Sequence, residues 1–207
     1  MKSQLRVTII DYGVGNVYSV ANALNFLGYT IKVSREVRDI VNTDVLILPG
    51  VGAFEEAITN LRNYNLESLL NEQVIALKKP ILGICVGMQM LANGSHENGW
   101  HTGLGWINGE VKKLELPKLY SIPHVGWNDI VVEKQAPLFS HSGDGTNFYF
   151  DHSYHFDCEE QYKAAVVDYG ISVTAAVQKE NIFGVQFHPE KSQTNGLKLF
   201  RSFLNSI

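Results

Sequence analysis

Three short stretches of the sequence hold residues whose types and spacing could carry out acyl transfer. The first, GICVG at residues 83 to 87, places Cys85 with one glycine two positions before it and another two positions after it. A nucleophile on a tight turn between a strand and a helix has this pattern, because glycines relieve the crowding around its strained backbone. The helix that follows favours the thiolate. The alternative is that Cys85 is a small core residue beside packing glycines.

The second stretch, VQFHPEKS at residues 185 to 192, brings a histidine and an acid together. Its apolar beginning is typical of a strand, Pro189 lets the chain leave the sheet after His188, and Glu190 follows. At this spacing the carboxylate can fix the tautomer of the imidazole while the other ring nitrogen faces a nucleophile. The alternative is a histidine at a strand end beside a glutamate that faces solvent.

The third stretch, ILPGVGAF at residues 47 to 54, is a glycine-rich loop after an apolar run. Its backbone N–H groups could point at an anion, as an oxyanion hole requires, although taken alone it is an ordinary turn between a strand and a helix. A thiol, a histidine with an orienting acid and a donor loop are together the minimum set for acyl transfer through a thioester. The three stretches therefore form one candidate site.

The order of the expected elements explains how these stretches could meet. In the first half of the chain, β-rich apolar segments alternate with segments that have apolar residues at helical spacing. This alternation predicts a parallel sheet with right-handed crossovers, and the carboxyl ends of its strands meet at one edge. The expected strands are 5–13, 30–34, 44–50 and 79–85, and the expected helices are 16–28, 53–77 and 86–93.

From about residue 103 the pattern changes to short strands joined by turns, which predicts antiparallel additions to the same sheet. The amphipathic segment 195–207 is expected to close the chain as a helix. There is no linker and no internal repeat, so the sequence indicates a single domain over residues 1–207. The expected fold class is α/β, with an open, mostly parallel twisted sheet flanked by helices and extended by antiparallel strands in the C-terminal half.

The bulk composition excludes several classes of function. With a net charge of −4 and interspersed charges, the chain of 207 residues offers no basic stripe to a nucleic acid. Its apolar stretches are interrupted and shorter than the roughly 18 residues of a membrane span, so we expect no membrane role. The N-terminal segment has no signal-peptide pattern, and Cys85 and Cys158 are too few to indicate a disulfide framework. We expect two free thiols and a cytoplasmic location.

Two other kinds of binding site find little support. A dinucleotide-binding fingerprint that begins at Gly13 would need a third glycine at the position of Tyr18, and the phosphate-binding P-loop pattern does not occur. The HSYH segment, with His152 and His155, lacks a clustered third ligand for a metal ion. We therefore expect neither a metal nor a cofactor.

The stretches PGVGAF, GICVGMQ and GVQFHPEKS together resemble the class I, or triad, glutamine amidotransferases, and the resemblance spans nearly the whole chain. IIDYGVGNVYSV at 9–20, IPHVGWN at 122–128 and HSY at 152–154 narrow it to the glutaminase subunits of imidazole glycerol phosphate synthase, an enzyme of histidine biosynthesis. The resemblance implies a flavodoxin-like arrangement of sheet and helices. It also implies hydrolysis of L-glutamine to glutamate and ammonia.

The resemblance assigns a role to each matching residue. Cys85 would be the nucleophile, His188 the general base and acid, and Glu190 its orienting partner. The remaining matches are Gly52 and the amide of Val86 for the oxyanion hole, and Gln89, Ser153 and Tyr154 for the binding of glutamine. Each of these last three has an ordinary alternative, as a residue of a helix surface or of a strand.

The resemblance also implies a protein partner, because ammonia is mostly protonated at neutral pH and must reach an enclosed second active site. That partner would be a (β/α)8-barrel cyclase in a heterodimer, with Asn16, Trp127 and Lys191 near the docking face. Asp151 stands where the family usually has valine. This difference leaves open a glutaminase that supplies a surface-polysaccharide sugar amidotransferase. A regulatory glutaminase-like subunit is a separate alternative, since such proteins can lose their nucleophile.

Overall fold

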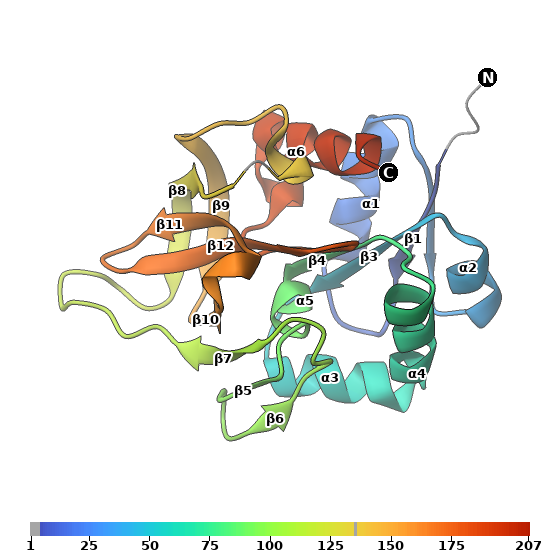
Figure 1. Cartoon of the computed structure of the whole chain (residues 1–207), viewed down its shortest axis with the longest axis horizontal. Coiled ribbons are helices and arrows are strands. Elements are labelled where there is room, and N and C mark those ends of the chain that lie inside the picture. The colour runs from blue at the N-terminus through green and yellow to red at the C-terminus, as the bar shows by residue number, and fades with distance from the viewer. Residues whose placement is uncertain (1–4, 135) are drawn as a thin grey trace.

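The computed structural model describes residues 5–134 and 136–207, which form two β-sheets with flanking helices (Figure 1). Over these ranges the larger sheet has nine strands in the order β2-β1-β3-β4-β13-β12-β11-β8-β9, and the smaller has four in the order β10-β7-β5-β6. The larger sheet comprises β1 (Arg6–Ile10), β2 (Thr30–Ser34), β3 (Val45–Gly50), β4 (Ile81–Cys85), β8 (His124–Val132), β9 (Thr146–His152), β11 (Lys163–Asp168), β12 (Ser172–Lys179) and β13 (Ile182–Val185). The smaller comprises β5 (Gly94–Ser95), β6 (His101–Thr102), β7 (Gly109–Lys113) and β10 (Tyr154–Cys158). Residues 1–4, which entered the expectation of no signal peptide, lie outside the described ranges.

The mode of strand pairing changes once across the larger sheet, from parallel to antiparallel, at β13. The neighbours β2, β1, β3, β4 and β13 run parallel to one another. Each pair from β13 to β9 is antiparallel. This α/β arrangement confirms the expected parallel sheet with antiparallel strands in the C-terminal half of the chain.

The expectation that every C-terminal strand joins the same sheet is wrong for residues 109–113 and 154–158. These segments, β7 and β10, pair with each other in the smaller sheet. The apolar segment around residues 147–156 is not one strand but two, interrupted at Ser153. The carbonyl oxygen of Ser153 accepts a hydrogen bond from the amide of Leu114 at 2.9 Å, which holds the chain where it leaves the larger sheet.

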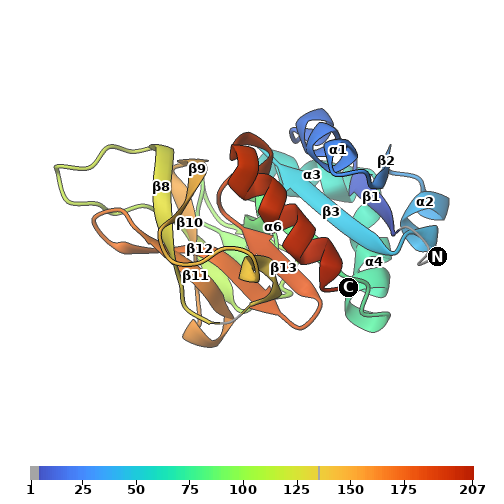
Figure 2. The ribbon, with the colours of Figure 1, turned by 90° about the horizontal axis from the view of Figure 1, so that it is seen from above.

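Helices cover both faces of the larger sheet, with α1 and α6 on one face and α3, α4 and α5 on the other (Figures 1 and 2). In α1, the buried residues Val17, Val20, Ala21 and Leu24 recur at the spacing of one helix face. In the described residues, none of the helices has the length and apolar character that crossing a membrane requires. The α-helices are α1 (Val17–Phe26), α2 (Val37–Asn42), α3 (Phe54–Asn63), α4 (Leu66–Leu70), α5 (Val86–Gln89) and α6 (Gln193–Asn205). Shorter turns are the π-helical η1 (Asn71–Ala76) and the 3₁₀ turns η2 (Pro137–Phe139), η3 (Glu160–Tyr162) and η4 (Pro189–Lys191).

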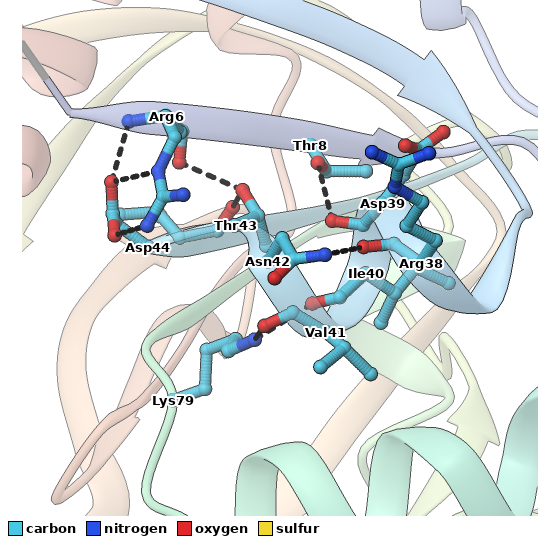
Figure 3. Close-up of polar contacts among 11 residues, drawn as sticks. Arg6, Thr8, Arg38, Asp39, Ile40, Val41, Asn42, Thr43, Asp44 and Lys79 are labelled. Atoms are coloured by element: carbon cyan, nitrogen blue, oxygen red, sulfur yellow. Dashed lines mark hydrogen bonds and ion pairs between the residues drawn. The ribbon is translucent and has the colours of Figure 1, made fainter.

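Polar contacts join the amino ends of the parallel strands to one another and to α2 (Figure 3). The Arg6 guanidinium donates to both carboxylate oxygens of Asp44 at 2.8 and 3.1 Å, which joins the beginnings of β1 and β3. Lys79 Nζ donates to the carbonyl oxygens of Ile40 and Val41 at 2.7 and 2.8 Å. These carbonyls lie in the last turn of α2 and lack helical partners, so a cation is well placed there. The opposite ends of the strands carry the candidate site.

The turn from β4 into α5 requires glycine at two positions. A Cβ on Gly87 would lie 1.8 Å from the carbonyl oxygen of Leu48 in β3. A Cβ on Gly83 would lie 2.6 Å from the carbonyl oxygen of Gly87. Carbon and oxygen atoms do not approach so closely, and backbone cannot move aside as a flexible side chain can. The two glycines around Cys85 therefore allow α5 to sit directly on the sheet.

Substitution of Gly87 by alanine should destabilise the protein by about 3 kcal/mol or prevent folding, because the methyl group overlaps the Leu48 carbonyl. The measurement is the free energy of unfolding in urea. The matched control is Gly143→Ala, since a Cβ on Gly143 would meet no atom within 4 Å. Equal stability of the two variants would contradict the close packing of α5.

Candidate active site

The structure brings the three candidate stretches together at the carboxyl ends of neighbouring parallel strands. In the pairing of β3 with β4, Gly50 lies opposite Cys85. On the other side of β4, β13 pairs in parallel and leads to His188. One cavity of about 570 Å³ is lined by Gly52, Cys85 and His188 together. This is the edge at which a parallel sheet gathers functional groups.

Cys85 has the strained backbone of a nucleophile on a turn. Its φ is 53° and its ψ is −112°, although it carries a side chain, and only 4% of the residue is exposed. Such a conformation costs about 1–3 kcal/mol and persists where the surrounding structure enforces it. The close contact of Gly83 and Gly87 with backbone supplies that enforcement. The sulfur consequently lies in the cavity wall at the start of α5.

His188 and Glu190 form a buried pair beside the thiol. His188 Nδ1 donates to Glu190 Oε1 at 2.8 Å, and the two side chains are only 3% and 1% exposed. Burial by itself would lower the pKa of His188, but hydrogen bonds with Cys85 and Glu190 raise it to about 10. Because Nδ1 is hydrogen-bonded to Glu190, Nε2 is the ring nitrogen that is left to hydrogen-bond with Cys85. The imidazole is therefore cationic at neutral pH and favours a thiolate next to it.

The glycine-rich loop follows β3 directly beside the start of α5. Gly52 has a φ of 82°, a conformation that favours glycine. A Cβ on Gly50 would lie 2.6 Å from the amide nitrogen of Gly87, so the loop and the helix are in contact. The backbone groups expected to form the oxyanion hole, at Gly52 and Val86, thus both line the cavity that holds the thiol.

Tyr12 is a buried residue of this region that lies within the IIDYGVGNVYSV stretch, although the sequence gave it no role of its own. Its hydroxyl donates to the carbonyl oxygen of Pro49 at 2.5 Å, immediately before the glycine-rich loop. Burial and the nearby Cys85 both raise its pKa, so the phenol stays neutral. Tyr12 therefore supports the loop and carries no charge into the site.

The expected glutamine-binding residues Gln89, Ser153 and Tyr154 also line the cavity. Gln89 Nε2 donates to the carbonyl oxygen of Tyr154 at 2.9 Å and to Gln186 Oε1 at 3.1 Å, so its N–H groups are used within the protein. Glu97, which no sequence motif indicated, lines the cavity as well and accepts a hydrogen bond from the amide of Phe54 at 2.8 Å. A carboxylate there suits the ammonium group of an amino acid.

His152, which lines the cavity, and His124, which contacts His152, form an electrically neutral pair. His152 Nδ1 must donate to the carbonyl oxygen of Tyr154, at 2.9 Å, since a carbonyl only accepts. His124 Nδ1 then donates to His152 Nε2 at 3.0 Å, and Asn128 Nδ2 donates to His124 Nε2 at 3.4 Å. Burial lowers the pKa of His124 to about 4 and that of His152 to about 3. In the described ranges, no group of three or more metal-ligating side chains is assembled here or elsewhere.

The residues expected at the docking face lie in two places. Asn16 and Lys191 line the cavity, and Asn16 Nδ2 donates weakly to Glu190 Oε1 at 3.5 Å. Lys191 Nζ lies over the ring of Tyr149, 5.4 Å from its centroid. Trp127 lies on β8, outside the residues that line the cavity, and is 43% exposed. Both cysteines are free, as expected, and both are buried.

The family model for class I glutamine amidotransferases matches residues 8–206 of the chain. The chain belongs to this family. The amidotransferase is 50% identical, over 98% of its length and 95% of the relative's, to imidazole glycerol phosphate synthase subunit HisH 2 of Vibrio vulnificus. It is 43% identical, over 96% of its length and 98% of the relative's, to imidazole glycerol phosphate synthase subunit HisH 1 of Campylobacter jejuni. The solved structure of PurLQS from Thermotoga maritima shares the fold, with a TM-score of 0.74, 19% identity and coverage of 98% and 99%.

Substitution of Glu190 by glutamine should slow glutamine hydrolysis by this amidotransferase roughly 10²- to 10⁴-fold. It should also move the alkaline limb of the pH profile below about 10. The Glu190 carboxylate helps to raise the pKa of His188, so its loss leaves less imidazolium in mildly alkaline solution. The measurement is glutamate release across neutral and alkaline pH.

The control for this variant is Glu180→Gln, which removes an exposed carboxylate that pairs with Lys78. Its pH profile should match that of the unmodified enzyme. An alkaline limb that stays in place in the Glu190 variant would show that Glu190 does not act on His188.

Proposed function

We propose that this amidotransferase is the glutaminase subunit of imidazole glycerol phosphate synthase. It hydrolyses L-glutamine to glutamate and ammonia and passes the ammonia to a cyclase. The observation that carries the proposal is the meeting of Cys85 and His188 in the wall of one cavity, with a cationic imidazole beside the thiol and the buried Glu190 hydrogen-bonded to that imidazole. The names of the relatives support the choice of synthase. The complete triad argues against the alternative of a regulatory subunit without a nucleophile.

The first half of the reaction forms a γ-glutamyl thioester. The Cys85 thiolate attacks the side-chain amide carbon of glutamine, and the C=O electron pair moves onto oxygen. Backbone N–H groups at Gly52 and Val86 stabilise this oxyanion. His188 Nε2 then gives its proton to the departing nitrogen as the C–N bond breaks, which releases ammonia and leaves a neutral imidazole.

The second half of the reaction hydrolyses the thioester. Neutral His188 takes a proton from water through Nε2, and the water oxygen attacks the acyl carbon. The C–S bond breaks, glutamate forms, and the thiolate again lies beside an imidazolium. Glu190, with its hydrogen bond to Nδ1, keeps the ring in the orientation that both steps need. Glutamine is held by Gln89, Ser153 and Tyr154, with its ammonium group near Glu97.

The proposed partner is a (β/α)8-barrel cyclase in a heterodimer, which receives the ammonia before water protonates it. Asn16, Trp127 and Lys191 are its proposed contacts. The position of Asn16 and Lys191 in the cavity wall supports this assignment, because a partner seated there would cover the site from which ammonia leaves. The half-exposed Trp127 offers the kind of aromatic side chain that anchors protein interfaces. The proposed location is the cytoplasm.

A second candidate acceptor follows from Asp151. This acid stands where the family usually has valine and lines the cavity, and it keeps a partner in surface-polysaccharide sugar amidination as the alternative acceptor. The two acceptors are separated by mixing the chain with the cyclase and its ribonucleotide substrate. Glutamine-dependent formation of imidazole glycerol phosphate supports the first acceptor, and glutamine hydrolysis that the cyclase does not stimulate supports the second.

In the complex with the cyclase, Cys85→Ala should abolish product formation from glutamine and leave product formation from added ammonia unchanged. The reason is that only the glutamine reaction needs the thiol. The measurement is the rate of cyclase product formation with each nitrogen source. Cys158→Ala is the control, since Cys158 lies outside the cavity lining, and it should retain both activities. Continued use of glutamine by the Cys85 variant would overturn the assignment of the nucleophile.

Trp127→Ala should weaken binding of the cyclase by about 10- to 100-fold, as expected for an aromatic anchor at the centre of an interface. Binding is measured by titration calorimetry with the purified cyclase. The control is Phe26→Ala, which removes another exposed aromatic ring, on the last residue of α1, and should leave the affinity unchanged. Equal affinities of all three proteins would place Trp127 outside the interface.

A further inference from the structure

Gln186 is a fully buried amide that contacts the nucleophile and has no assigned role. It follows the last residue of β13 and stands two positions before His188. None of its surface is exposed. Its Nε2 lies 3.7 Å from Cys85 Sγ, within the range of a hydrogen bond to sulfur. A buried polar side chain is costly unless its hydrogen bonds are satisfied, so the contacts of Gln186 need an explanation.

The direction of the Gln186 amide is fixed by its neighbours. The carbonyl oxygen of Tyr154 can only accept, so Gln89 must turn its N–H groups toward it, at 2.9 Å. The same Nε2 of Gln89 lies 3.1 Å from Gln186, which must therefore present its oxygen there. The N–H groups of Gln186 are left facing the sulfur. The donor at Cys85 is thus set by a chain of hydrogen bonds that starts at a backbone carbonyl.

A hydrogen-bond donor at this position stabilises the thiolate of Cys85 more than its thioester. A thiolate is a strong acceptor and a thioester sulfur is a weak one, so the Gln186 N–H stabilises the anion before attack and again as it leaves the acyl group. The carbonyl oxygen of Asp151, 4.0 Å from Sγ, offers the thiol form an acceptor instead. His188 supplies charge on one side of the sulfur, and Gln186 supplies a neutral donor on another.

We propose that Gln186 is a catalytic residue that donates a hydrogen bond to Cys85 Sγ and stabilises the thiolate. The proposal rests on the proposed function only in taking Cys85 as the nucleophile. It assigns the buried amide of the VQFHPE stretch to the same chemistry as the histidine and the acid that follow it. The role differs from that of Glu190, which reaches the sulfur only through the imidazole.

The test is alkylation of Cys85 by iodoacetamide in the Gln186→Glu variant. This substitution keeps the shape and the acceptor for Gln89 but turns a carboxylate oxygen toward the sulfur. Alkylation at neutral pH should be roughly 10- to 100-fold slower, which is the factor that a hydrogen bond to a charged group contributes. The dependence of the alkylation rate on pH should also shift to higher pH. Mass spectrometry of the Cys85 peptide separates this reaction from that of Cys158, whose pKa burial raises to about 11.

Two further variants make the result specific. Gln186→Leu removes the donor without adding charge and should slow alkylation by a smaller factor. Gln178→Glu places the same substitution on β12, where Gln178 pairs with Phe183, and should leave the Cys85 profile unchanged. Thermal unfolding establishes that each variant is folded. If the glutamate variant does not fold, the leucine variant carries the test.

Three outcomes overturn the proposal. One is an unchanged alkylation profile in the folded Gln186 variants. Another is slower alkylation with unchanged kcat for glutamine in the complex, which would limit Gln186 to a structural contact. A third is an equal effect of Gln178→Glu. Failure of the proposed function is seen separately, as glutamine turnover that persists in Cys85→Ala whatever the Gln186 variants do.

Discussion

The whole site depends on the contact between the start of α5 and the backbone of β3. Gly87 lies so close to the Leu48 carbonyl oxygen that only a hydrogen atom fits between them. This contact fixes where α5 begins, and hence the strained backbone of Cys85 at its first turn. It also sets the glycine-rich loop, which leaves β3 two residues after Leu48, against the same helix end. Packing and presentation of the thiol are therefore one structural requirement, met by the same glycines.

The buried histidines near this contact differ in charge because their hydrogen-bond partners differ. His188 is buried, but an adjacent carboxylate and thiol outweigh the desolvation and hold it as a cation. His124 and His152 are also buried, and their partners are a carbonyl, an amide and each other, so burial is the largest influence on the pKa of each and both remain neutral. In the proposed mechanism, the cation takes part in proton transfer. The neutral pair is part of the hydrogen-bonding structure of the cavity wall, which His152 lines.

The carbonyl oxygen of Tyr154 is the point where two chains of hydrogen bonds meet. One runs through His152 and His124 to Asn128 on β8, the strand that also carries Trp127. The other runs through Gln89 and Gln186 to the sulfur. Because a carbonyl only accepts, the orientation of every group in both chains follows from this atom. Tyr154 is the first residue of β10 after the interruption at Ser153, and both residues line the cavity.

The sequence by itself determined the alternation of strands and helices in the first half, and with it the meeting of Cys85, His188 and the glycine-rich loop. Apolar periodicity and the topology of parallel strands act locally and by fixed rules, so they are legible in a single chain. The resemblance to the family added the proposed glutamine-binding positions. Glu97, Tyr12, His124 and Gln186 came only from the tertiary structure. Tyr12, His124 and Gln186 lie within stretches that the sequence analysis singled out, but the stretches gave them no role, because the contacts of each are with partners far away in the chain. The transfer of β7 and β10 to a second sheet was likewise decided by tertiary contacts, because strand propensity specifies that a segment is extended but not which edge it joins.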